Sequence, residues 1–129
     1  MELTGGSMAK PLAFRPHEHL RRPADFQRVY DRRRSASDEL LLVYVCENGL
    51  PHLRLGLSVS RKVGPATRRN RLRRLYREAF RLTRQEMPTG LDLVVIPRHA
   101  EPSLEQLRLS LPRLVSQVAR RLAREEVGS

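Results

Sequence analysis

The densest concentration of charged side chains in this sequence lies between residues 61 and 84. Ten basic residues stand there against one acidic residue, Glu78, so the segment carries +9 of the chain's formal net charge of +11. All of the ten except Lys62 are arginines. A guanidinium group binds phosphate oxygens in pairs and stacks on bases, which a lysine ammonium group does not do. The chemistry that these residues offer is therefore the binding of a polyanion.

This basic segment is predicted to be a helix that starts at Gly64-Pro65 and stops at Pro88-Thr89-Gly90. One face is apolar and should pack on a core, through Leu72, Leu75, Tyr76, Ala79 and Phe80. Another face is cationic, with Arg69 and Arg71 at its flank and Asn70, Arg73, Arg74, Arg77, Arg81 and Arg84 along it. Charged helix faces are usually only solvated surfaces. Here, however, neighbouring arginines repel by roughly 0.2–0.5 kcal/mol a pair, a cost that a bound polyanion would offset.

Residues that could cleave a phosphodiester bond are present but scattered. A metal-dependent nuclease needs several carboxylates that converge on cations. No ligand spacing relates the acidic and histidine candidates Asp25, Asp31, Asp38, Glu39, Asp92, Glu101, His17, His19, His52 and His99. The single Cys46 has no second thiol for a disulfide or a zinc site, so we expect it to fill the core. The sequence thus predicts neither catalytic nor metal-binding residues in this chain.

The spacing within the basic segment resembles the signature of the bacterial ribonuclease P protein subunit. The matching residues are Arg61-Lys62-Val63-Gly64, Ala66, Arg69-Asn70-Arg71, Arg73-Arg74 and Arg77. A generic arginine-rich helix needs no glycine, alanine and Arg-Asn-Arg triplet at these separations. The resemblance implies an RNA-binding basic helix whose contacts are Arg61, Lys62, Arg68, Arg69, Asn70, Arg71, Arg73, Arg74 and Arg77.

A second group of candidate residues is aromatic. Phe26, Val29 and Tyr30 recur at i, i+3 and i+4 on a short helix predicted from about Ala24 to Arg32. Such a trio is most simply interpreted as core. Similarity to the family's first helix implies instead that Phe26 and Tyr30, with Tyr44, line a cleft for a single-stranded RNA leader. The small polar face of the next strand suits such a strand and adds Ser58 and Ser60.

Several further elements should position these two groups of residues. Apolar runs predict strands over 39–46, 54–60 and 91–96, with a short edge strand near Ser35. Ser103 and Gln106 form a capping box at the start of a last helix, which Pro112 should kink. The apolar stripe of that helix is Leu104, Leu107, Leu111, Leu114, Val115, Val118 and Leu122. The order of elements predicts an α+β fold, a single-domain α-β-β-β-α-β-α sandwich.

The length of 129 residues and the hydrophobic content of 40% suit one domain. We expect a mobile N-terminal arm over 1–16, the domain over 17–124 and a frayed tail over 125–129. The resemblance covers roughly residues 20–122. It implies a fold like that of ribosomal protein S5 domain 2, with a left-handed crossover from the 54–60 strand through the basic helix to the 91–96 strand.

The resemblance also implies a function. In this family a catalytic RNA with bound Mg²⁺ removes the 5′ leader of precursor tRNA, and the protein subunit binds both that RNA and the leader. Mg²⁺ would be bound mainly by the catalytic RNA and the substrate. The alternative is a structural RNA-binding protein such as a ribosomal component. No membrane-spanning run or signal peptide is evident, so we expect a cytoplasmic protein with no membrane partner.

Overall fold

The computed structural model describes residues 16–128 of the chain. Its strands are β1 (Ser35–Ser37), β2 (Leu41–Glu47), β3 (Arg54–Leu57) and β4 (Leu91–Pro97). Its helices are α2 (Pro23–Arg32), α3 (Ala66–Thr83) and α4 (Leu104–Gly128), with short 3-10 helices η2 (Pro16–Glu18), η3 (Arg61–Val63) and η4 (Arg84–Glu86). The predicted order α-β-β-β-α-β-α is confirmed.

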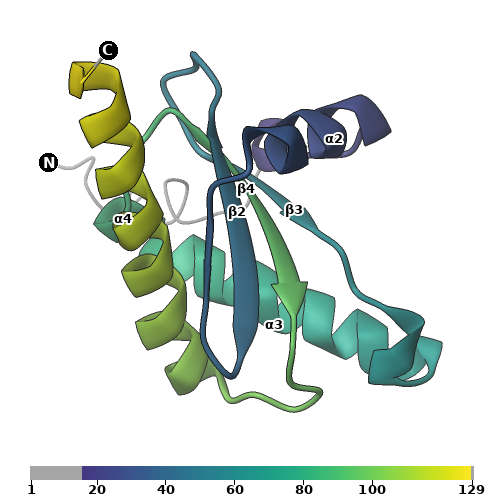
Figure 1. Cartoon of the computed structure of the whole chain (residues 1–129). Coiled ribbons are helices and arrows are strands. Elements are labelled where there is room, and N and C mark those ends of the chain that lie inside the picture. The colour runs from purple at the N-terminus through teal and green to yellow at the C-terminus, as the bar shows by residue number, and fades with distance from the viewer. Residues whose placement is uncertain (1–15, 129) are drawn as a thin grey trace, which may run out of the picture.

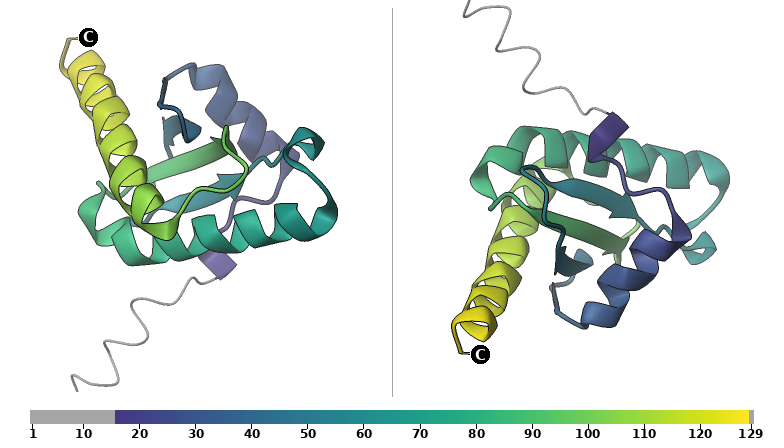
Figure 2. Two further views of the ribbon diagram at one scale, coloured as in Figure 1. Left: turned by 90° about the horizontal axis from the view of Figure 1, so that it is seen from below. Right: turned by 90° about the horizontal axis from the view of Figure 1, so that it is seen from above.

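The four strands form one sheet in the order β1-β2-β4-β3. β2 pairs antiparallel with β1 and β4, whereas β3 runs parallel to β4. α2 packs on one face of this sheet, and α3 and α4 pack against each other on the opposite face (Figures 1 and 2). The three layers are the predicted sandwich.

The connection from β3 through α3 to β4 has the hand that the family resemblance implied. In Figure 1 both strands run downward, β3 lies to the right of β4, and α3 passes behind the sheet. Viewed from the helix side with the strands pointing up, the chain therefore moves from right to left. The crossover is left-handed, an exception to the common right-handed βαβ connection.

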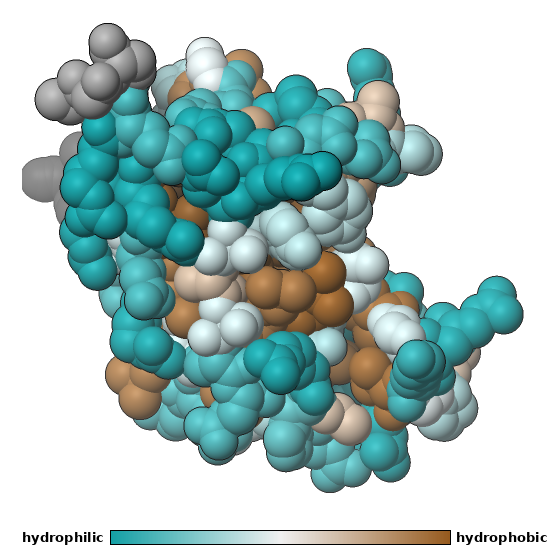
Figure 3. Space-filling model, viewed as in Figure 1, coloured by the Kyte–Doolittle hydropathy of each residue, from teal (hydrophilic) through white to brown (hydrophobic). Residues whose placement is uncertain are grey.

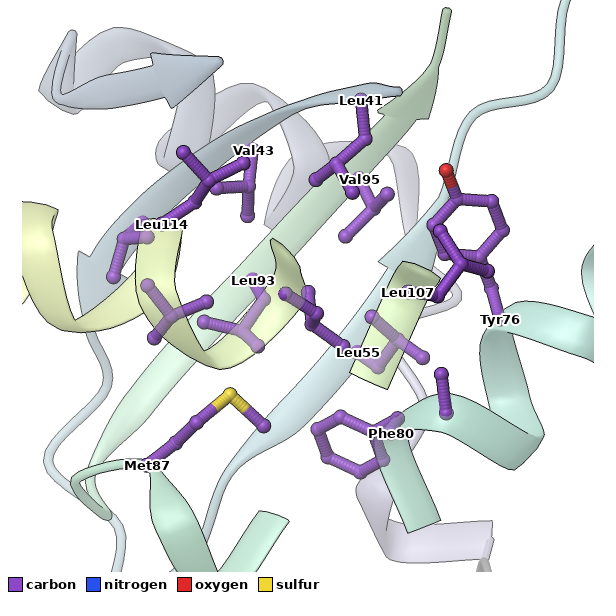
Figure 4. Close-up of a cluster of buried hydrophobic side chains, with 14 of the residues drawn as sticks. Leu41, Val43, Leu55, Tyr76, Phe80, Met87, Leu93, Val95, Leu107 and Leu114 are labelled. Carbon is purple, nitrogen blue, oxygen red and sulfur yellow. The ribbon is translucent and has the colours of Figure 1, made fainter. Parts of the chain in front are cut away.

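The main core lies between the sheet and the helix pair formed by α3 and α4. Leu41, Val43 and Val45 of β2 point into it, because side chains alternate along a strand. The apolar stripes predicted for the basic helix and for the last helix are buried there, except that Leu75 and Leu104 are partly exposed. Figure 4 shows Tyr76 and Phe80 of α3 beside Leu107 of α4 and strand residues such as Leu55. Cys46 is buried on the other face, as expected.

The start of α3 differs in detail from the prediction. Pro65 is the N-cap and not the first helical residue, and Arg61 and Lys62 lie in η3, ahead of the helix. Gly64 joins the two helices with φ of 146°, a conformation that favours glycine, and an added Cβ would lie 3.0 Å from Arg68 Cδ. The predicted basic helix is therefore a helix preceded by a separate basic turn.

Two strands are shorter than predicted, because nearby side chains bond to the backbone at their ends. The Asp38 carboxylate accepts hydrogen bonds from the N–H groups of Leu40 and Leu41, so β2 begins only at Leu41. Ser60 caps η3 by accepting from the Lys62 N–H, so the chain has turned by then and β3 ends at Leu57.

The ends of α4 depend on specific side chains. The predicted capping box is present: the Ser103 N–H donates to Gln106 Oε1 at 2.9 Å, and the Gln106 N–H donates to Ser103 Oγ at 3.1 Å. Pro112 lies buried within the helix. The helix continues to Gly128, past Arg124, where we predicted a frayed tail, and Glu125 forms ion pairs with Arg32 and Arg34. The predicted arm, apart from Pro16, lies outside the described residues.

Candidate nucleic-acid interface

The first half of α3 and the turn before it form a basic surface. Its members are the exposed or partly exposed side chains of Arg61, Lys62, Asn70, Arg71, Arg73, Arg74 and Arg77. Asn70 Oδ1 accepts a hydrogen bond from Arg73 Nη1 at 3.1 Å and so orients that guanidinium. Arg71, Arg74 and Arg77 form no ion pair within the described part of the chain. This surface is therefore available for phosphate groups.

Other arginines of the predicted ridge are occupied within the protein. Arg81 pairs with Glu78 at 2.6 Å. Arg84 pairs with Glu18 at 2.5 Å, and its side chain is only 12% exposed. Both were predicted to continue the cationic face. Their placement shows that the basic surface ends near Arg77, because later arginines neutralise carboxylates instead.

Two of the predicted RNA-contact residues, Arg68 and Arg69, are partly buried. Arg68 pairs with Glu101 at 3.1 Å. The Nε of Arg69 has no hydrogen-bond partner within the described residues. An unsatisfied buried donor is costly, so a ligand oxygen that reached it would stabilise the site.

A groove of about 440 Å³ connects the basic surface with the segment before α2. It is lined by His19, Leu20, Arg21, Leu55, Leu57, Arg73 and Arg77. Burial, with the positive charges of Arg21 and Arg77, lowers the pKa of His19. At neutral pH the imidazole is therefore uncharged, and arginines supply the positive charge of this groove.

The three predicted cleft aromatics meet on the α2 face of the sheet. Tyr44 of β2, Val94 of β4 and Gly56 of β3 form a row across the strands. Tyr30 meets Tyr44 edge to face, with ring centroids 5.1 Å apart. Phe26 lies over Gly56, where a Cβ would stand 2.6 Å from the ring, so only glycine lets the helix approach this closely.

We call these rings the aromatic platform (Phe26, Tyr30 and Tyr44). Their surroundings have features of both interpretations of the sequence, a core cluster and a cleft for single-stranded RNA. The rings pack against a small buried cluster of Leu20, Val29, Cys46 and Val94. Each ring nevertheless remains partly exposed. Partial exposure above a supporting core is what a stacking surface for bases requires.

The sheet beside the platform is uncovered. Leu42 and Ile96 form the next cross-strand pair on this face and are only partly buried, an exposure that the apolar sequence pattern did not predict. Figure 3 shows a hydrophobic patch at the centre of the hollowed face. Ser58 is partly buried after β3, and Ser60 is exposed at the start of η3. Both predicted serines thus lie in the segment of chain that joins β3 to the basic turn η3.

A buried carboxylate anchors the other end of this face. Asp92 is fully buried and accepts hydrogen bonds from Arg54 (2.8 Å), from Asn48 (2.9 Å) and from Arg28. Burial raises the pKa of Asp92, but the hydrogen bonds from Arg54 and Asn48 and the charge of Arg54 outweigh it, so the pKa lies below its ordinary value. A lone acid inside the apolar run of residues 91–96 was the signal for this network.

Within the described residues, no three His, Cys, Asp or Glu side chains come together in a way that could hold a metal ion. Among the described helices, none combines the length and the apolar character needed to cross a membrane. The candidate site is a surface of arginines, aromatic rings and small polar groups.

A basic surface on α3 and an aromatic platform on the sheet, in a single-domain α+β fold with a left-handed βαβ unit, are features of the class of RNA-binding proteins. A family model described as Ribonuclease P matches residues 14–119. This chain belongs to the ribonuclease P protein family, as the resemblance indicated.

Related proteins agree in sequence and in structure. The ribonuclease P protein component of Thermotoga maritima is 44% identical over 86 residues, which cover 67% of this chain and 74% of that protein. The corresponding protein of Alkaliphilus oremlandii is 39% identical over 80 residues, covering 62% and 70%. The solved RNase P protein of T. maritima superposes with a TM-score of 0.71 at 36% identity and covers 78% of this chain and 97% of that one. The Staphylococcus aureus RNase P protein gives a TM-score of 0.68 at 34% identity, with 79% and 94% covered.

Proposed function

We propose that this chain assists the catalytic RNA of ribonuclease P in the endonucleolytic removal of the 5′ leader from precursor tRNA. The main support for the proposal is the difference between the arginines in the first part of α3 and those at its end. Arg71, Arg74 and Arg77 are exposed without ion pairs in the described part of the chain, whereas Arg81 and Arg84 are paired with acids. Unpaired arginines at helical spacing match a row of phosphates, so we assign the basic surface to the RNA subunit.

The aromatic platform is assigned to the leader. A single strand offers unstacked bases, and aromatic rings bind such bases by stacking with little dependence on sequence. Leu42 and Ile96 extend the platform with a flat apolar surface, and Ser58 and Ser60 leave room for a backbone. This arrangement suits a segment that differs in sequence from one precursor to the next.

We place the catalytic centre in the RNA subunit and Mg²⁺ mainly with that RNA and the substrate. Mg²⁺ prefers oxygen ligands that include carboxylates, and the described residues gather no suitable set in this chain. The protein's own part is binding and orientation of RNA. This role implies a cytoplasmic location, because precursor tRNA is found there. The alternative role as a ribosomal component is not favoured, because the family match is to ribonuclease P.

Reconstitution with the cognate RNA subunit tests the proposal. The wild-type protein should allow cleavage of precursor tRNA at low Mg²⁺, where the RNA subunit by itself is slow. The protein freed of RNA should cleave nothing. Cleavage by rigorously RNA-free protein would contradict the location of the catalytic centre, and a failure to stimulate the RNA would contradict the assisting role.

A further inference from the structure

A second group of arginines lies at the other end of the molecule from the basic surface. The C-terminal half of α4 and the edge strand β1 enclose a groove of about 490 Å³, lined by Ser35, Ala36, Ser37, Gln117, Arg120, Arg121 and Arg124. Figure 2 shows the short β1 between α2 and this half of α4. In Figure 1 the C-terminus of α4 and the start of α3 lie at opposite corners.

The outer edge of β1 presents backbone donors and acceptors to the groove, and Arg121 already occupies the Ser35 carbonyl oxygen. The Asp38 N–H donates to Leu41 O and the Val45 N–H donates to Arg34 O, so Ala36 is the β1 residue that exchanges hydrogen bonds with β2. By the alternation of an antiparallel ladder, the N–H groups of Ser35 and Ser37 point away from β2, to the outer edge of the sheet. The opposite edge is covered, since the Leu20 N–H donates to Leu55 O at 2.9 Å along β3.

One arginine of the groove, Arg121, is held at this edge, and within the described residues no ion pair neutralises the other two. Arg121 donates to Ser35 O, which fixes α4 against β1. Arg120 and Arg124 are exposed one helical turn apart, and no ion pair is found for either within the described residues. Glu125, next in the chain, is instead held by Arg32 and Arg34. Among the residues that the structure describes, no acidic side chain lines the groove.

Two outward N–H groups and two unpaired guanidinium groups form a site for a phosphate-like anion. Backbone N–H groups and arginines are the usual donors to nucleic-acid phosphates. The helix dipole alone could explain cations near a helix C-terminus, but it does not explain the open strand edge that faces them.

The groove also adjoins the aromatic platform. Ser35 is the direct cross-strand partner of Tyr44, and directly opposed side chains lie on the same face of a sheet. A strand stacked on Tyr44 would therefore pass over Ser35 when it leaves the sheet at the β1 edge.

We propose that the groove between β1 and the C-terminal half of α4 binds backbone phosphates of RNA, as a contact separate from the basic surface of α3. This inference rests on the proposed function for the identity of the RNA. The phosphates belong either to the distal part of the leader or to the RNA subunit, and the two sources are separable by experiment.

The test compares Arg120→Ala/Arg124→Ala with a control of equal charge on the same helix, Arg108→Ala/Arg113→Ala, whose arginines are paired with Glu105 and Asp38. One arm measures the Kd of each protein for the RNA subunit. The other measures the Kd of each assembled holoenzyme for precursor tRNAs with a graded series of leader lengths.

A loss of about three- to tenfold in the first arm, with a shallower salt dependence, assigns the groove to the RNA subunit. The same loss in the second arm, only for leaders long enough to pass β1, assigns it to the leader. Arg120→Lys/Arg124→Lys should recover part of the loss, because it keeps charge but not the paired donors. If the groove variant behaves as the control in both arms, or if both lose affinity equally, the inference is wrong.

Nuclear magnetic resonance of the free protein separates this result from a failure of the proposed function. A short single-stranded RNA oligonucleotide should shift the amide signals of Ser35 and Ser37 in the wild type and in the control but not in the groove variant. Absence of these shifts in the wild type overturns the groove, whereas failure of the wild type to stimulate the RNA subunit overturns only the assisting role.

Discussion

Single residues on the α2 face of the sheet contribute to the packing of the fold and are also the residues that we propose to bind the leader. Tyr44 supports Tyr30 from below while part of its ring remains exposed, and Phe26 depends on the absence of a side chain at Gly56. At the far end of the same face, Asp92 holds Arg28 and Arg54 against the sheet. Changes at these positions therefore need a measurement of stability beside any measurement of binding.

Tyr44→Ala should weaken binding of precursor tRNA to the reconstituted holoenzyme by about 5- to 150-fold, since stacking is worth roughly 1–3 kcal/mol per base. Binding of mature tRNA should hardly change, because it has no leader. Tyr44→Phe keeps the ring and should stay near wild type. The prediction is wrong if binding of precursor and mature tRNA weakens equally. It is also wrong if a thermal melt shows that the alanine variant is largely unfolded at the assay temperature, because the role of Tyr44 would then be purely structural.

Asp92→Asn should lower the free energy of unfolding by about 2–4 kcal/mol, because it leaves two arginines without their buried carboxylate. The folded pKa of Asp92 lies below its unfolded value of about 3.9. Its contribution to stability is therefore present above that unfolded value and is lost as the pH falls through the folded pKa. Denaturant unfolding from neutral to acid pH should show a steeper decline in wild type than in Asp92→Asn. Asp31→Asn, at an exposed position, is the control, and parallel pH profiles for wild type and Asp92→Asn would contradict the argument.

At the scale of elements, α3 is one helix with two electrostatic halves. The first turn of α3 contains basic side chains and no acidic one. Positive charges at the N-terminus of a helix are unfavourable, because they lie at the positive end of the helix dipole. The second half of α3 is neutralised by Glu78 and, through η4, by Glu18. The apolar stripe runs along both halves and is buried, so removal of surface arginines should leave the helix in place.

Arg71→Ala/Arg74→Ala/Arg77→Ala should weaken binding of the RNA subunit and make it less dependent on salt. Each phosphate contact contributes roughly 0.7–0.9 to the slope of log affinity against log salt, so three lost contacts should reduce the slope by about 2–3. Circular dichroism should show an unchanged helix content. The control is Arg81→Ala/Arg108→Ala/Arg113→Ala, which removes the same charge from arginines paired with acids. Equal slopes for the two triple variants would assign the effect to net charge alone.

The whole molecule carries a formal net charge of +11 on 129 residues. Within the described residues, two groups of exposed arginines without ion pairs are Arg71, Arg74 and Arg77 on α3 and Arg120 and Arg124 on α4. Like charges repel across such a small protein and oppose its compact state. The fold therefore retains an electrostatic cost that a bound polyanion or dissolved ions would reduce.

We accordingly expect the Tm of the free protein to rise with ionic strength at neutral pH, because salt screens the repulsion over distances beyond about 10 Å. A gain of 1 kcal/mol corresponds to roughly 4 °C for a domain of this size. Differential scanning calorimetry in increasing sodium chloride measures the effect. A Tm that stays flat or falls would show that the ion pairs, which salt weakens, dominate over the net charge.

The amino-acid sequence by itself determined the periodic features. The spacing of Leu72, Tyr76 and Phe80 specified the buried face of α3, because this pattern depends only on helix geometry. In β2, alternation specified only which residues share a face, because both faces of the run are apolar. The capping box of α4 is equally local, with its two residues three positions apart. The order of the elements followed from the same short-range signals.

Only the tertiary structure decided which charged groups are neutralised and which remain available. Arg84 meets Glu18 across 66 positions, Arg28 meets Asp92 across 64, and Arg121 reaches Ser35 across 86. Sequence spacing carries no information on such pairs, because the partner is set by how the sheet and helices pack. For that reason the prediction placed Arg84 on the cationic face, and the groove beside β1 was not foreseen. Arg81 differs, because its partner Glu78 is only three positions away on the same helix, a local pairing that the sequence already allowed. The charge of an arginine is a local property, but its availability to RNA depends on the whole fold.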